Sequence, residues 1–219
     1  MIVEVSLKGS LMIHPKIPIH GSVISNDHQA IIFMGPRKCG KSSTAYLMIE
    51  RGWNLIADSI SYISKINEKY FVEASGKNKF MTFPFPSIFP ELNQNENTFE
   101  EFSQKHNEMR LFIDSIRIFP GQTDEISQIR LFMFPRLTDQ EKSQIFELSP
   151  SEAMAIFKQD AWHLHHESYD LTEEDEIFLR EMFDHIKCYR LNIGKNWKTF
   201  IEELIEMDHI FNTDVQLHR

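Results

Sequence analysis

The sequence is poor in cysteine, in glycine and in net positive charge. Its 219 residues include eight glycines and only two cysteines, Cys39 and Cys188. Two cysteines are too few for the disulfide framework of a small secreted protein. The formal net charge of -9 argues against a nucleic acid as a partner, because a phosphate backbone is bound by a basic surface.

Long apolar runs are also missing. No stretch approaches the roughly 20 apolar residues that a helix needs to cross a bilayer. The first residues do not have the charge and apolar pattern of a signal peptide. We therefore expect a cytoplasmic protein without a membrane partner. The apolar residues that are present, 42% of the chain, are enough for one core, so we expect a single domain over residues 1–219.

Apolar segments bounded by turn residues predict an α/β fold with more strands than helices. Residues 30–34 form a continuous apolar run, which is typical of a strand buried on both faces. Residues 149–152 form a capping box with proline at the first helical position, which predicts the start of a helix. The expected strands lie at about 2–8, 10–14, 19–25, 30–34, 53–57, 61–66, 70–74, 110–118, 128–134 and 187–193.

Helices are expected at about 41–51, 150–160, 172–186 and 195–207, so that a helical part covers about 149–207. The polar and acidic segment at about 91–108 has no clear periodicity. We expect it to be a mobile loop or a short surface helix.

A phosphate-binding pattern, G-x-x-x-x-G-K-[ST], follows the apolar run. In such a loop the glycines let successive N–H groups turn toward phosphate oxygens, and the helix behind it presents its positive end. Lys41 would reach the terminal phosphates, and the Ser42 hydroxyl would ligate magnesium. The pattern predicts a site for a nucleoside triphosphate. The residues expected to contact it are Gly35, Pro36, Arg37, Lys38, Cys39, Gly40, Lys41, Ser42 and Ser43.

Asp58 follows the short strand expected at 53–57. A strand–loop–helix–strand unit returns the chain in the same direction, so we expect Asp58 at the same sheet edge as the phosphate loop. A carboxylate there can hold magnesium or accept a proton from an attacking hydroxyl. The alternative interpretation is a turn or cap residue for the segment 58–62.

Taken together, these segments resemble the catalytic domain of the HPr kinase/phosphorylase family, the P-loop serine kinases of bacteria. The resemblance is specific over about residues 19–66 and weaker afterwards. The chain is similar to short, divergent members without a separate N-terminal domain, some of which phosphorylate ribosomally made peptides. The segments that resemble the family are His20-Gly21, Gly35–Ser42, Gly52–Asp58 with Arg51 before it, Ser149–Ala153 and Cys188–Leu191.

This resemblance implies an α/β P-loop core of the HPr kinase and PEP carboxykinase type, with a mixed sheet and C-terminal helices. It implies ATP and Mg²⁺ as cofactors, a serine of a small protein or peptide as acceptor, and a homo-oligomer. Asp58 would be the general base, and Lys41 and Ser42 would hold the phosphates. Magnesium would be bound by Ser42 and Asp58. His20 would lie close to the phosphates, with a buried strand histidine as the alternative.

Two positions depart from the family pattern. Ser43 stands where the family usually has glutamate, and Ser59 stands where it has a second aspartate. The loss of two carboxylates weakens magnesium binding, because this ion prefers negatively charged oxygen ligands. Two further functions therefore stay open. One is a regulatory pseudo-kinase that binds nucleotide without transfer, and the other is a kinase of a small hydroxylated molecule, with the segment 91–108 as its lid.

Overall fold

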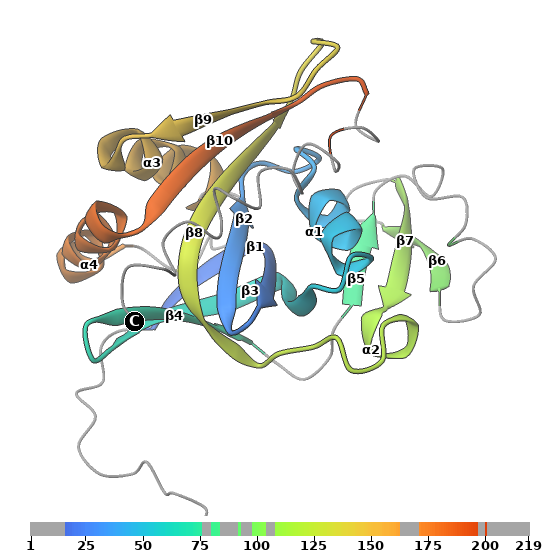
Figure 1. Ribbon diagram of the computed structural model, residues 1–219, viewed down its shortest axis with the longest axis horizontal. Helices are drawn as coiled ribbons and strands as arrows, with labels where there is room; N and C mark the ends of the chain where they lie inside the picture. Colours follow the sequence, from blue (N-terminus) through green and yellow to red (C-terminus); the bar gives the residue numbers. More distant parts are fainter. Residues whose placement is uncertain are drawn as a thin grey trace, which may run out of the picture.

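A computed structural model gives the fold of the chain (Figure 1). It describes residues 16–75, 80–83, 92, 98–103, 108–162, 171–196 and 200. The strands expected at 2–8 and 10–14 lie outside the described residues, and so does most of the helix expected at 195–207.

A seven-stranded mixed sheet with the order β2-β1-β3-β4-β8-β10-β9 forms the centre of the molecule. Strand β2 also pairs with β8, so that β2, β1, β3, β4 and β8 close into a ring. The described strands of this sheet are β1 (Ile17–Asn26), β2 (Gln29–Met34), β3 (Asn54–Ile66), β4 (Lys69–Ala74), β8 (Ile126–Leu137), β9 (Gln144–Leu148) and β10 (Lys187–Ile193).

Two tight hairpins fix the register of the ring. Asp27 and His28, with φ of 47° and 61°, connect β1 to β2, and Asn67 and Glu68, with φ of 48° and 62°, connect β3 to β4. Two central residues with positive φ are typical of the turn whose twist matches that of paired strands. Strand β1 is therefore antiparallel to β2 and also antiparallel to β3, so β2 and β3 run in the same direction with β1 between them.

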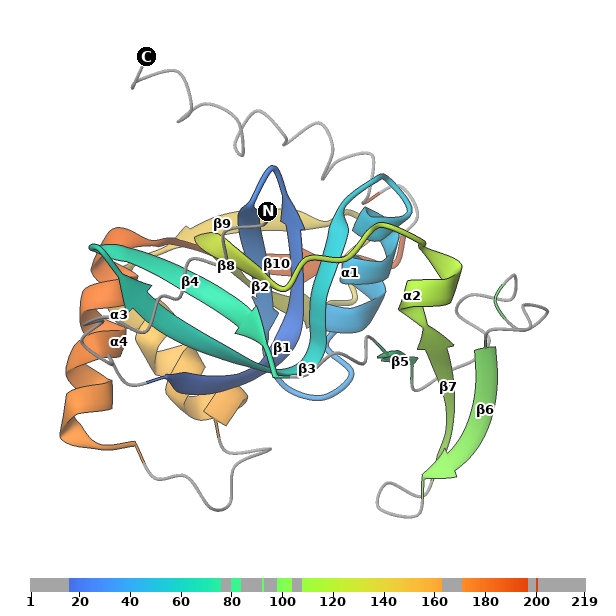
Figure 2. The ribbon, with the colours of Figure 1, turned by 90° about the horizontal axis from the view of Figure 1, so that it is seen from below.

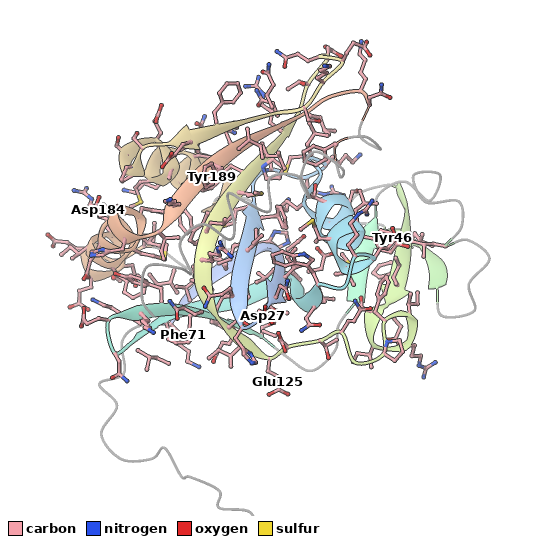
Figure 3. The ribbon with its side chains drawn as sticks, in the orientation of Figure 1. Asp27, Tyr46, Phe71, Glu125, Asp184 and Tyr189 are labelled. Atoms are coloured by element: carbon pink, nitrogen blue, oxygen red, sulfur yellow. The ribbon has the colours of Figure 1, made fainter. Side chains whose placement is uncertain are left out.

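Helices cover both faces of the sheet. Helix α1 (Lys41–Ile49) packs on one face, with α3 (Pro150–Ile156) and α4 (Glu173–His185) on the other. Tyr46 on α1 and Asp184 on α4 lie on opposite sides of the sheet (Figure 3). Strands alternate between the two cores: Phe33 of β2 packs with α1, and Ile32 packs with α3 and α4.

A small antiparallel sheet with the order β5-β7-β6 lies beyond α1 (Figure 2). Met81 and Ile113 from this sheet share the apolar core of Ala45 and Ile49 on α1, so the helix is buried between the two sheets. The strands are β5 (Phe80–Phe83), β6 (Thr98–Ser103) and β7 (Glu108–Asp114), and the short helix α2 (Ser115–Ile118) follows β7.

The structure confirms the expected fold class, an α/β core with a mixed sheet, and corrects several elements. Strand β6 lies within the segment 91–108, which was expected to be a loop or a short helix. The strand expected at 110–118 ends at Asp114, whose side chain caps α2. The helix expected at 150–160 is α helical only to Ile156 and continues as a π-helix, η3 (Phe157–Trp162). Strand β9 was not predicted.

Candidate phosphate-binding site

The phosphate loop connects the end of β2 to the start of α1. Three of its residues have positive φ: Gly35 at 149°, Lys38 at 64° and Gly40 at 105°. Gly40 is the N-cap of α1, and Thr44 N donates to Gly40 O at 2.9 Å as the first helical hydrogen bond. Left-handed residues before a helix orient backbone N–H groups toward a common centre, which is the arrangement that anion-binding loops use.

Lys41, the first residue of α1, lies inside this loop. Its side chain is buried, and Nζ donates to the carbonyl oxygens of Gly35 and Pro36, both at 2.9 Å. A buried ammonium group needs such partners, because burying the charge without hydrogen bonds would destabilise the protein by roughly several kcal/mol. The charge of Lys41 is therefore fixed at the centre of the loop, where an anion would bind.

The ends of β8 and β10 support the loop from one side. A Cβ atom on Gly40 would lie 2.8 Å from Ile193 Cδ1, and one on Gly35 would lie 3.1 Å from Cys39 Sγ. Cys39 is buried, and its Sγ lies 3.9 Å from Lys41 Nζ. The side chain of Cys39 therefore fills the inside of the loop.

The sequence analysis expected Asp58 just after the end of a short strand. In the structure it lies inside β3. The strand runs without a break from Asn54 to Ile66, because β1 supplies hydrogen-bond partners on both sides of this position. Asp58 is half-buried and lies directly opposite Ser22 of β1, whose hydroxyl donates to Asp58 Oδ1. The interpretation of Asp58 as a turn residue is therefore wrong.

The register places Asp58 near the phosphate loop. Ser22 lies opposite Asp58 on one side and opposite Phe33 of β2 on the other. Adjacent strands are about 4.8 Å apart, so Asp58 lies about 10 Å across the sheet from β2. Phe33 belongs to the core beneath α1, so Ser22 and Asp58 lie on the face of the sheet that carries this helix.

His20 lies on β1, the strand between β3, which carries Asp58, and β2, which leads into the phosphate loop. It is two residues from Ser22 on β1, so the two side chains share one face of the sheet. Gly21 pairs with Met34, the last residue of β2, so His20 lies one residue beyond the end of this pairing, where the chain of β2 enters the loop. The half-buried His20 is therefore the residue of β1 beside the start of the phosphate loop.

The other residues that the sequence analysis singled out lie either in or next to the phosphate loop or on the face of the sheet opposite Asp58. Ser42 and Ser43 are half-buried in the first turn of α1, and Ser59 is exposed and alternates to the face opposite Asp58. Arg37 is half-buried and Lys38 exposed. The nucleotide contacts expected of the loop residues stay predictions.

Ser22 is a residue of the site that the sequence pattern did not single out. It is fully buried. The signal that could have found it is the alternation of β1, which puts a hydroxyl two residues after His20 on the same face. Its pairing with Asp58, however, depends on how β1 and β3 align, since the two residues are 36 positions apart in the sequence.

The oxygen ligands at this site suit a hard cation. The Ser42 hydroxyl and the Asp58 carboxylate are the kind of groups that magnesium binds, together with phosphate oxygens and water. Over the described ranges, no cluster of three or more histidine, cysteine, aspartate or glutamate side chains forms a metal site of its own. Nor does any helix in the described part of the chain have the length and apolarity needed to span a membrane.

Comparisons with known proteins found several that are similar to this chain. No family model matches the chain. The HPr kinase/phosphorylases of a Thermoanaerobacter species and of Thermoanaerobacter pseudethanolicus are each 41% identical to it over 54 residues, which are 25% of this chain and 18% of the relative. That of Caldicellulosiruptor bescii is 34% identical over 58 residues, which are 26% of this chain and 19% of the relative. The matches therefore span about a fifth of the length of these relatives.

Among solved structures, the Hpr(Ser) kinase/phosphatase from Coxiella burnetii aligns with 91% of this chain and 99% of its own, with a TM-score of 0.48 and 12% sequence identity. Over the matched segment, the chain is similar to the HPr kinase/phosphorylases of these bacteria.

Proposed function

We propose that this chain is an ATP-dependent kinase that transfers a phosphate group to a serine hydroxyl of a small protein or peptide. The observation that supports this most strongly is the placement of Asp58. Its carboxylate, bonded to Ser22, shares the α1 face of the sheet with His20, which lies beside the phosphate loop. A general base and a phosphate-binding loop with a central lysine are parts that phosphoryl transfer uses.

The loop would bind the phosphates of ATP. Backbone N–H groups between Gly35 and Ser42 would donate to phosphate oxygens, and Lys41 Nζ would exchange its bonds with the carbonyl groups for bonds to the terminal phosphates. Ser42 and Asp58 would hold magnesium, which supplies neutralisation of the phosphate charge when it is bound. His20 would contact the terminal phosphate from β1.

Asp58 would take the proton of the acceptor. As the serine oxygen forms its bond to the γ-phosphorus, the Asp58 carboxylate accepts the hydroxyl proton. The bond between the γ-phosphorus and the bridging oxygen breaks, and ADP leaves with that oxygen. Because this reaction needs little covalent participation by the protein, most of the rate would come from positioning and charge neutralisation.

The acceptor that we propose is a small protein or a peptide, such as a ribosomally made precursor. The similarity to HPr kinase/phosphorylases supports a protein acceptor. We propose that the chain works in the cytoplasm, where ATP is supplied, and as a homo-oligomer.

A nucleotide-binding regulatory module is the second candidate, because Ser43 and Ser59 carry no negative charge. Ser59 is exposed on the face opposite Asp58, so it adds no ligand beside that carboxylate. In this case the protein would bind ATP tightly and transfer nothing.

The experiment is a transfer assay with ATP, magnesium and a library of serine-containing peptides, read by mass spectrometry. We expect a mass gain of one phosphate on a serine, and its loss in Asp58→Asn. ATP binding without any phosphopeptide, with manganese as well as with magnesium, would reject the kinase in favour of the regulatory module. Transfer to a small hydroxylated molecule alone would reject the peptide acceptor.

A further inference from the structure

Ser22 is a buried polar side chain in the middle of the sheet. It is 0% exposed, with β2 on one side and β3 on the other. Its neighbours in register are the apolar Phe33 and the carboxylate of Asp58, and its hydroxyl donates to Asp58 Oδ1. A hydroxyl at such a position stabilises the protein only if it has a hydrogen-bond partner.

Other buried serines of the described strands show that such a partner is not automatic. Ser61 of β3 and Ser127 of β8 are equally buried, and neither Oγ has a hydrogen-bond partner. Ser61 lies three residues along the same strand as Asp58, and its side chain alternates to the opposite face of the sheet. Ser22 and Ser61 are thus two buried serines on neighbouring strands, of which only Ser22 bonds to Asp58.

We propose that Ser22 is a positioning residue for Asp58. Its hydroxyl fixes one carboxylate oxygen against β1, which holds the side chain of Asp58 on the face of the sheet that carries α1 and the phosphate loop. This inference rests on the proposed role of Asp58 as the base and adds a residue that acts through it.

The physical reason is the strictness of the geometry for proton transfer. A base must lie within hydrogen-bond reach of the hydroxyl that it deprotonates, and a displacement of about 1 Å can reduce the rate by about a hundredfold. Asp58 is only half-buried, so apolar packing alone does not fix its carboxylate.

The test compares Ser22→Ala with Ser61→Ala in the transfer assay. For Ser22→Ala we expect kcat to fall roughly 10- to 100-fold, while the KM for ATP changes by less than about threefold. Ser61→Ala removes a buried hydroxyl from the neighbouring strand without touching Asp58, so its kcat should equal that of the wild type. Thermal unfolding of each variant shows that the fold is retained.

A double-mutant cycle separates positioning from a general effect on the sheet. If Ser22 acts through Asp58, Ser22→Ala should have no further effect on the residual rate of Asp58→Asn. A wild-type kcat in Ser22→Ala, an equal loss in Ser61→Ala, or additive losses in the double mutant would each overturn the proposal.

A binding measurement keeps the two proposals distinct. If the wild-type protein transfers no phosphate, the proposed kinase activity is rejected. The role of Ser22 is then tested by measuring how much magnesium increases the affinity for ATP in each variant. An oriented Asp58 would contribute modestly to this gain, so Ser22→Ala should reduce it about twofold, whereas Ser61→Ala should leave it unchanged. An unreduced gain in Ser22→Ala would overturn the positioning role.

Discussion

Among single residues, Gly21 sets how closely β1 approaches β2 beside the phosphate loop. It pairs with Met34 on one side and with Ser59 on the other. A Cβ atom at this position would lie 2.6 Å from the backbone carbonyl oxygen of Phe33. The obstacle is backbone, which cannot rotate away, so a side chain at residue 21 must push the two strands apart.

Gly21→Ala is therefore expected to lower the free energy of unfolding by about 1–3 kcal/mol, as overpacking does elsewhere. It should also weaken ATP binding, because the displaced end of β2 leads into Gly35. Urea unfolding and titration calorimetry measure the two effects. Gly121→Ala is the control: it has nothing within 4 Å and a φ of 82°, so it should cost stability through backbone strain but leave ATP affinity unchanged. Wild-type stability and affinity in Gly21→Ala would contradict this account.

The site residues that could be predicted from the sequence are those that belong to a local motif. Lys41 lies at the centre of the loop, as the glycine–lysine–serine pattern requires. His20 and Asp58 share one face of the sheet, but neither of their roles has been tested. Ser22 could not be predicted, because its partner is decided by the register of two strands and not by neighbouring residues.

At the scale of elements, the helix starts were the most predictable features. Ser149 and Glu152 form the expected capping box at α3, with hydrogen bonds in both directions. These signals are local, because the side chains bond to backbone groups three residues away. Strands β6 and β9 were missed, since their hydrogen-bond partners, β7 and β10, are supplied by tertiary pairing.

The capping box makes a testable contribution to stability that depends on pH. Hydrogen bonds from the Ser149 hydroxyl and backbone N–H lower the pKa of Glu152 in the folded protein. A lowered folded-state pKa stabilises the protein above the ordinary value of 4.5, and this stabilisation is lost as the pH falls through the folded pKa. Glu152→Gln should therefore be less stable than the wild type at neutral pH, and the difference should shrink below pH 4.5.

Thermal unfolding at several pH values measures this difference. Ser149→Ala should cost about 1 kcal/mol at neutral pH, since it removes the cap itself. Gln159→Ala, an exposed and uncharged position further along the same segment, should show no such pH dependence. A constant gap between Glu152→Gln and the wild type from neutral to acid pH would show that the ionised carboxylate of Glu152 does not stabilise the folded protein through this capping box.

Across the whole molecule, the closed ring of strands explains why Asp58 lies on the face of the sheet that carries α1. β2 and β3 run in the same direction, as the strand–helix–strand reasoning expected, but β1 is inserted between them. The pairing of β2 with β8 that closes the ring joins residues about 100 positions apart, such as Ile32 and Phe132. No local pattern specifies such a contact, so the fold class could be predicted from the sequence and the strand order could not.

The central claim is that the loop binds the nucleotide and Asp58 carries out the proton transfer. The most direct measurement determines ATP affinity by calorimetry and phosphate transfer in a single turnover, on Lys41→Ala and Asp58→Asn in parallel. Lys41→Ala should lose about tenfold or more in affinity, and transfer should fall with it. Asp58→Asn should keep ATP affinity within about threefold and lose roughly 100- to 10,000-fold in transfer. Full transfer by Asp58→Asn, or unchanged ATP affinity in Lys41→Ala, would contradict the account.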